Sequence, residues 1–231
     1  MATATAKLDV QPIQAEYSLK DRIYSALKEA ITSMNIYAED AELRLDEREL
    51  SEKLTISRTP IREALARLEQ EGLVRIVPRK GVYIVRKTKQ EILEMITVWA
   101  ALEGMAARLI TLNASDEEIA SLRRLFTTFR GDQIEAHIDE YSDTNIKFHQ
   151  TILSLSRCQL LKDMADNLFV HMRSIRARTI TEDGRANRSI VDHLHIIEAL
   201  ESRDTELAER LVREHTLNLA AHVERNVDYL D

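Results

Sequence analysis

The stretch that decides the fold lies near residue 60 and reads Ser57-Arg58-Thr59-Pro60-Ile61-Arg62-Glu63-Ala64-Leu65. Ser57 is a residue type that caps helix N-termini, and Pro60 falls in a first turn, where its missing N–H is not needed. Gly72 follows at a position where helices commonly end in a left-handed residue. The sequence therefore predicts a short amphipathic helix between Ser57 and Gly72. Its apolar side chains recur on one side of that helix: Ile61, Ala64, Leu65 and Leu68.

The polar side of this helix is basic near its start. Arg58 and Arg62 are four residues apart and share one face, with Thr59 beside them. Arginine bonds O6 and N7 of guanine together, and a Ser or Thr hydroxyl bonds phosphates or bases. Residues 55–87 carry eight basic and three acidic side chains, although the whole chain has a net charge of −7. A local basic segment on an acidic protein is typical of a small nucleic-acid-binding module.

The segments around this helix complete a winged helix-turn-helix. Apolar residues recur at helical spacing over 19–34, and Asp46 precedes a second helix that ends near Leu54. β-branched runs over 73–77 and 82–85 predict two strands, joined by a basic turn with Lys80 near its tip. In this fold the third helix enters the DNA major groove with its N-terminal residues at the base edges. We assign three helices and a hairpin to residues 18–87, and a flexible arm to residues 1–17.

Three stretches of this module resemble the GntR family of bacterial transcription regulators. Besides residues 57–65, they are Leu45-Asp46-Glu47-Arg48-Glu49-Leu50-Ser51 and Leu68-Glu69-Gln70-Glu71-Gly72-Leu73-Val74. The resemblance implies that these residues contact operator DNA: Arg48, Ser57, Arg58, Thr59, Arg62 and Gly81 of the wing. One position departs from the family, because Thr55 stands in the turn where Gly is usual. The alternative is that Arg58 and Arg62 are only surface charges, or pair with Glu63 and Glu69.

Residues 88–231 read as a second domain of about six helices. Thr88 and Ser115 each precede a helix with acidic residues in its first turn, a typical N-terminal pattern. Gly131 interrupts the chain, and residues 183–185 read as a loop. Helices are expected after Thr88, after Ser115, and over 133–155, 160–179, 187–202 and 204–228. No strand pattern occurs after Val85, so the predicted fold class is mainly α, a winged helix followed by an all-helical bundle.

The second domain is similar to the C-terminal effector domain of the FadR-type GntR subfamily, called the FCD domain. The resemblance rests on Ala100-Ala101-Leu102-Glu103-Gly104-Met105-Ala106-Ala107, on Asn145-Ile146-Lys147-Phe148-His149, and on His193 and His215. In many members an Asp or Asn with three histidines binds a divalent metal inside the bundle. The resemblance therefore implies a metal site made of Asn145, His149, His193 and His215. Imidazoles with one oxygen ligand suit Zn, Ni, Co or Mn.

Two residues of this domain depart from the subfamily. Asn145 replaces the commoner Asp, and a neutral amide leaves the full charge of the ion uncompensated. Such a site holds metal less tightly and attracts an anion more strongly, which fits a small carboxylate effector. Trp99 replaces an Arg that salt-bridges an effector carboxylate in many members. Trp99 is either an aromatic wall of the pocket or a core residue. The positive charge that pairs with an effector carboxylate would then come from Arg173, Arg176 or Arg178.

Composition excludes several other classes. Only 5 Gly, 3 Pro and 5% aromatic residues occur, which argues against collagenous, low-complexity and all-β folds. The single cysteine, Cys158, cannot form an intrachain disulfide, which suits a reducing cytosol. The most apolar stretch, 92–110, is interrupted by Glu94, Glu103 and Arg108, and residues 1–10 lack an apolar core. We therefore expect a cytoplasmic protein with no membrane span and no signal peptide.

The predicted function is a ligand-responsive repressor. The second domain carries 17 basic and 25 acidic side chains, so it faces away from phosphate and is expected to hold a homodimer interface. Two copies on a palindromic operator double the base contacts, and a small organic acid releases or re-orients the DNA-binding modules. One alternative is the same regulator with a metal-free effector pocket. A metal-dependent hydrolase or lyase is disfavoured, because no carboxylate lies at the spacing of a general base beside the histidines.

Overall fold

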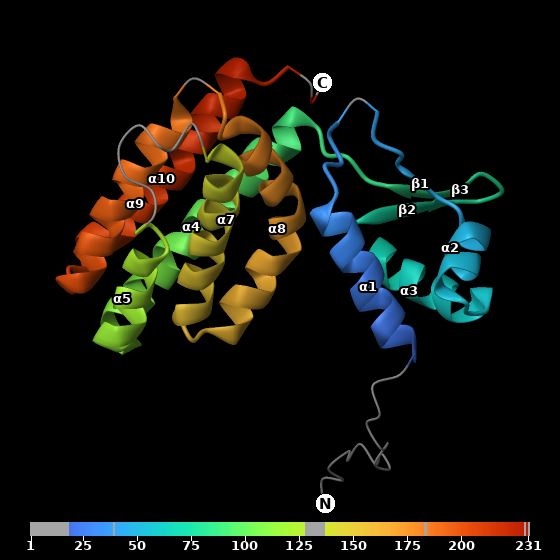
Figure 1. Cartoon of the computed structure of the whole chain (residues 1–231), viewed down its shortest axis with the longest axis horizontal. Helices are drawn as coiled ribbons and strands as arrows, with labels where there is room; N and C mark the ends of the chain where they lie inside the picture. The colour runs from blue at the N-terminus through green and yellow to red at the C-terminus, as the bar shows by residue number, and fades with distance from the viewer. Residues whose placement is uncertain (1–18, 39, 128–136, 183, 229, 231) are drawn as a thin grey trace, which may run out of the picture. The chain divides into compact units, whose positions relative to one another are not determined.

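The computed structural model describes residues 19–38, 40–127, 137–182, 184–228 and 230. Two compact units divide the described chain (Figure 1). The first contains residues up to Ala30 and Arg44–Tyr83, and the second contains Ile31–Leu43 and everything from Ile84 onward. The predicted arm, residues 1–17, lies outside the described residues.

The first unit is the predicted winged helix-turn-helix. Its helices are α1 (Leu19–Ser33), whose last three residues fall in the second unit, α2 (Glu47–Leu54) and α3 (Arg58–Gln70). The wing strands are β2 (Val74–Val77) and β3 (Gly81–Ile84), and a two-residue strand β1 (Arg44–Leu45) pairs antiparallel with β3. The sheet order is β1-β3-β2. β1 was not expected, because two residues carry no periodic signal.

The start of α2 and both ends of α3 lie where the sequence predicts them. The Asp46 carboxylate accepts the backbone N–H groups of Arg48 and Glu49, which caps α2. Ser57 stands at the N-cap of α3 in extended conformation, although its side chain makes no capping bond. At the other end Gly72 is left-handed (φ +75°), and Leu73 N–H donates to Leu68 O. This pair of features makes a Schellman ending, which closes α3 where the sequence predicts.

The second unit contains six helices among its described residues, in agreement with the expectation of about six. They are α4 (Lys89–Asn113), α5 (Asp116–Arg124), α7 (Ile138–Leu155), α8 (Gln159–Thr179), α9 (Arg185–Glu201) and α10 (Thr205–Asn226). Thr88 and Ser115 both form capping boxes with the glutamate three residues on, as predicted. The expected break at Gly131 and the expected helix start at residue 133 lie outside the described residues.

One boundary differs from the prediction. Arg185 was expected in a loop, but it begins α9 directly after Gly184, whose backbone is left-handed (φ +62°). Glycine adopts this conformation without strain, so the chain turns into the helix two residues earlier than the apolar pattern indicated. The change matters because it places the Arg185 guanidinium on the first turn of α9.

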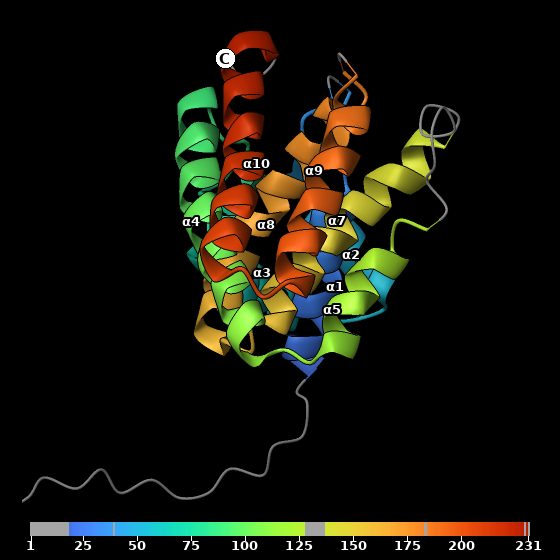
Figure 2. The same ribbon diagram turned by 90° about the vertical axis from the view of Figure 1, so that its left-hand side faces the viewer.

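α4 is the central helix of the second unit. It packs along α10, as Figure 2 shows, and also contacts α7, α8 and α9. By length and composition it is the one described helix apolar enough to cross a membrane, and half of its most apolar window is buried inside the protein. It also carries the fully buried Glu103. Core helices of globular domains pass the same test, and the packing of α4 is that of a core helix.

Candidate functional site

The DNA-reading residues expected on α3 lie on its surface. Arg58, Thr59 and Arg62 are all exposed at the start of the helix. Arg62 Nε donates to Glu47 Oε2 of α2 at 2.7 Å, and not to Glu63 or Glu69. Exposed ion pairs of this kind contribute little to stability, so the arginine can exchange its carboxylate for a phosphate or a base. Among the described residues Arg58 forms no ion pair.

Two backbone positions explain the local shape of this surface. Gly81 has φ +123°, a conformation that disfavours any side chain, and a Cβ there would meet Arg44 Nε at 3.4 Å. Thr55 has φ 54° and ends α2 in the left-handed conformation. The turn that usually carries Gly in the family therefore keeps its left-handed geometry here with a threonine. Lys80 lies exposed beside Gly81, as the predicted wing tip requires.

The three histidines named by the resemblance come together in the second unit. His149 on α7, His193 on α9 and His215 on α10 are buried, and one ring nitrogen from each lies within 4.8 Å of the others. His193 Nε2 and His215 Nε2 are 3.2 Å apart. Two nitrogens bound to one ion at about 2.0–2.1 Å lie about 2.9–3.4 Å apart, so this separation fits a shared metal.

Two carboxylates hold the histidines in orientation. His149 Nδ1 lies 2.5 Å from Glu103 Oε1, and His215 Nδ1 lies 3.0 Å from Asp192 Oδ2. Metal-binding histidines commonly donate their second ring N–H to a carboxylate in this way. The two rings thus turn Nε2 toward the shared centre.

Burial keeps His149, His193 and His215, called the triad below, neutral. It lowers the pKa of His149 and His193 well below the ordinary histidine value, and neighbouring positive charges add to the effect. Burial also lowers the pKa of His215, and the hydrogen bond that His215 donates to Asp192 opposes this shift. A neutral imidazole is the form that binds a metal ion.

Asn145 lies one helical turn before His149, on the same face of α7. It is buried, and among the described residues its Oδ1 accepts no hydrogen bond. A buried carbonyl oxygen without a partner is costly, and a metal ion is one group that can satisfy it. The triad, its two carboxylates and this oxygen fit a divalent metal.

Arg176 on α8 competes for the same site. Its Nη1 donates to His149 Nε2 at 2.7 Å, and its Nη2 lies 3.7 Å from Glu103 Oε2. Arginine has only donors, so His149 Nε2 must be the bare nitrogen and Nδ1 must carry the proton given to Glu103. The lone pair that would bind a metal is therefore the one that accepts from Arg176.

The other candidate positive charges lie elsewhere. Arg178 Nη1 donates to Tyr37 O at 2.9 Å, in the segment Ile31–Leu43 of the same unit. Arg173 lines a separate hollow beside Asp143. Of the three arginines left open by the sequence, Arg176 is the one at the triad.

Glu103 anchors this network from α4. Thr216 Oγ1 donates to Glu103 Oε2 at 2.6 Å, while His149 occupies the other oxygen. Burial raises the pKa of Glu103, and the Arg176 charge opposes that shift. Trp99, one turn earlier on α4, is fully buried with its ring centroid 5.8 Å from that of Phe169. This packing favours the core-residue interpretation of Trp99.

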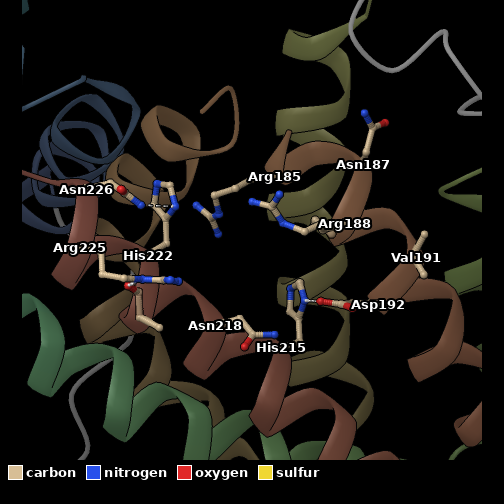
Figure 3. Close-up of a pocket in the computed structure, with 12 residues that line it drawn as sticks. Arg185, Asn187, Arg188, Val191, Asp192, His215, Asn218, His222, Arg225 and Asn226 are labelled. Carbon is tan, nitrogen blue, oxygen red and sulfur yellow. Dashed lines mark hydrogen bonds and ion pairs between the residues drawn. The ribbon is translucent and has the colours of Figure 1, made fainter. Parts of the chain in front are cut away.

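A cavity of about 650 Å³ opens between α9 and α10 beside the triad (Figure 3). His215 and Asp192 line it together with three arginines: Arg185, Arg188 and Arg225. Sequence reasoning missed these arginines, because they stand on two helices and match no motif. The available signal covers only Arg185 and Arg188, which end a segment, 173–188, with five basic and two acidic side chains.

Both units match families of known proteins. The description "Bacterial regulatory proteins, gntR family" matches residues 19–84, and "FCD domain" matches residues 94–218. The HTH-type transcriptional repressor RspR of Escherichia coli K12 is 25% identical over 78% of each chain. The Nta operon transcriptional regulator of Aminobacter aminovorans is 30% identical over 81% of this chain and 84% of that protein.

The solved structure of E. coli McbR/YncC superimposes with a TM-score of 0.74 at 24% identity. The match covers 92% of this chain and 100% of that one, which shows a shared fold. The matching families and relatives are transcriptional regulators, not enzymes. The chain therefore belongs to the GntR family of bacterial transcription regulators and joins its DNA-binding winged helix to an FCD domain.

Proposed function

We propose that this regulator is a cytoplasmic repressor of the FadR subfamily that binds palindromic operator DNA as a homodimer. A small organic acid bound in a metal-containing pocket of the FCD domain relieves repression. One observation carries the ligand-responsive part: three buried neutral histidines converge from three helices, two of them backed by carboxylates. The relative RspR, which is named as a repressor, supports the sign of regulation.

Base reading is assigned to the start of α3. Arg58 and Arg62 reach the major groove with Ser57 and Thr59, while Arg48 and the wing residues Lys80 and Gly81 contact the backbone. Two copies related by a two-fold axis read two half-sites about one helical turn apart.

The Arg58→Ala variant tests this surface. Once a selection from genomic fragments has supplied the operator, we expect the variant to bind it about 1–3 kcal/mol more weakly in gel shifts at fixed salt. Arg210→Ala is the control, because it removes the same charge from an exposed position of α10. Equal operator affinity for wild type and Arg58→Ala would contradict the assignment.

Asn145, His149, His193 and His215 would hold the metal, of which Zn, Ni, Co and Mn suit this donor set. When bound, the ion would supply open coordination positions for a carboxylate oxygen of the effector. Glu103 and Asp192 keep the proton on Nδ1 of two histidines. Phe126 and Phe148 pack against the ring of His193.

Elemental analysis of the native protein, purified without chelator or histidine tag, tests the metal. We expect about one ion per chain, its loss in His193→Ala, and its retention in His195→Ala, an exposed histidine on the same helix. A metal-free wild type that takes up no ion on titration would exclude the site.

The metal-free regulator is a second candidate, and one observation favours it. Arg176 already satisfies His149 Nε2 at 2.7 Å and brings a positive charge into the site. In that case the guanidinium itself would bind the acid. The same elemental analysis separates the two candidates.

A further inference from the structure

We propose that a hollow at the end of α1 is a second small-molecule site, separate from the triad, and that it binds zwitterions of the α-amino acid class. The hollow has a volume of about 350 Å³ and lies wholly within the second unit, between residues 32–35 and helices α7 and α8. It shares no lining residue with the cavity between α9 and α10. The inference therefore goes beyond the effector pocket proposed above.

Two side chains of opposite charge line this hollow without a partner. Asp143 is exposed on α7, and Arg173 is half-buried on α8. Among the described residues, neither side chain forms an ion pair or a hydrogen bond, with the other or with a third group. A carboxylate and a guanidinium that share a hollow but do not bond leave a place for a ligand that carries both complementary charges.

The end of α1 adds a second attraction for a cation. The last carbonyl groups of a helix carry partial negative charge, and α1 ends at Ser33 with no basic residue in its last turn. Thr32 and Ser33 both belong to the lining. A ligand ammonium would therefore meet the carboxylate of Asp143 and this helix end. The guanidinium of Arg173 would bind the ligand carboxylate, with which it can form two parallel hydrogen bonds.

The rest of the lining fits a small organic molecule. Met34 and Ile146 supply apolar surface, and Asn35 supplies an amide group. A volume of about 350 Å³ lies at the lower end of the range for small-molecule sites, which suits a ligand of amino-acid size. An anion without a positive group would leave Asp143 unpaired, and a cation without a negative group would leave Arg173 unpaired. The charges of the hollow therefore favour a zwitterion over either kind of simple ion.

Calorimetric titration of the full-length protein with the common L-amino acids, each up to about 10 mM, tests the inference. We expect at least one of them to bind, and to bind at least about tenfold more tightly than its two analogues that lack the ammonium or the carboxylate. Arg173→Gln and Asp143→Asn should each weaken that binding at least about tenfold. Arg124→Gln and Asp139→Asn are the matched controls, because they remove the same charges from exposed positions outside the hollow.

The His193→Ala variant separates the hollow from the triad. It disrupts the triad but changes no residue of the hollow, so it should keep the wild-type affinity for the amino acid. Binding that is lost in His193→Ala and kept in Arg173→Gln would place the ligand at the triad and overturn the inference.

Two outcomes with the wild type alone would also overturn it, and they need no variant to fold. One is that no amino acid binds, and the other is that the amino acid and its two analogues bind equally well. Metal content and operator affinity are measured on the same preparations. A wild type that binds operator and metal but no amino acid contradicts only this inference and leaves the proposed function standing.

Discussion

At the scale of single residues, Arg176 occupies a nitrogen of the proposed metal site. Its guanidinium donates to the only free lone pair of His149, so a metal can bind that nitrogen only after Arg176 moves away. A cation a few ångströms from a divalent ion also opposes its binding. Arg176→Gln removes both obstacles. We expect the variant to bind Co²⁺ at least about tenfold more tightly than the wild type, measured by competition with a chromophoric chelator.

Arg173→Gln is the matched control for this prediction. It removes the same charge from the same helix, at a position that lines a different hollow. An Arg176→Gln variant with unchanged Co²⁺ affinity, read also from the visible absorption of the bound ion, would show that the guanidinium does not compete.

Thr55 is a strained residue in the helix-turn-helix. Its left-handed backbone (φ 54°) costs a β-branched residue about 1–2 kcal/mol relative to glycine, partly offset by the entropy that glycine loses on folding. We expect Thr55→Gly to stabilise the first unit by about 0.5–1 kcal/mol in calorimetric unfolding. Thr59→Gly, inside the first turn of α3, should give no such gain. A destabilised Thr55→Gly protein would mean that the side chain of Thr55 contributes more than its backbone costs.

Residue-level prediction from sequence succeeded where the signal is local. The apolar stripe of α3, its ending at Gly72 and the two capping boxes follow from neighbours within one or two helical turns. The ion-pair partners of charged side chains could not be predicted from the sequence. Arg62 pairs with Glu47 across the turn, and not with a residue of its own helix, because that contact depends on how two helices cross.

At the scale of elements, α8 joins the triad to the segment Ile31–Leu43 within the second unit. Arg176 faces the histidines, while His171 Nδ1 lies 3.0 Å from Tyr37 Oη. Burial lowers the pKa of His171 to about 4, the Lys87 charge adds to the shift, and Glu91 opposes it. α8 thus carries a buried neutral histidine whose protonated form is disfavoured by burial.

The direction of the resulting pH dependence follows from proton counting. Between pH 6.5 and about 4 the unfolded chain protonates this histidine while the folded chain does not, so stability falls as pH falls. The contribution lost between pH 7.5 and 5 is about 2 kcal/mol. We expect His171→Gln to reduce the acid destabilisation of the second unit by that amount in urea unfolding. Fluorescence of Trp99, the only tryptophan, reports on this unit. Identical pH profiles for both proteins would contradict the assignment.

Elements that escaped sequence prediction share a physical cause. β1 has only two residues and exists because it pairs with β3, in the register Arg44↔Tyr83 and Leu45↔Val82. The first turn of α9, residues 185–188, carries only one apolar residue, Ala186, so its helical pattern starts late. Both features are stabilised by contacts across the fold and have no periodicity of their own.

At the scale of the whole molecule, the candidate site was accessible only through family resemblance. The histidines are separated by 44 and 22 residues and lie on three helices, so spacing alone does not predict that they meet. The resemblance named them, and the structure brings their nitrogens within 4.8 Å. The arginine cavity belongs to no quoted motif and required the tertiary packing of α9 on α10.

Regulation requires that the effector and the operator influence each other's binding. If the acid weakens operator binding by a given factor, the operator must weaken acid binding by the same factor. This holds because the binding steps of acid and operator form one thermodynamic cycle. We expect a coupling of about 1–3 kcal/mol, or about 5–150-fold. Titration of an acid that relieves repression into the free protein and into the operator complex measures the first factor, and gel shifts with and without that acid measure the second. Equal acid affinity in the presence and absence of operator would show that the effector pocket is not coupled to DNA binding.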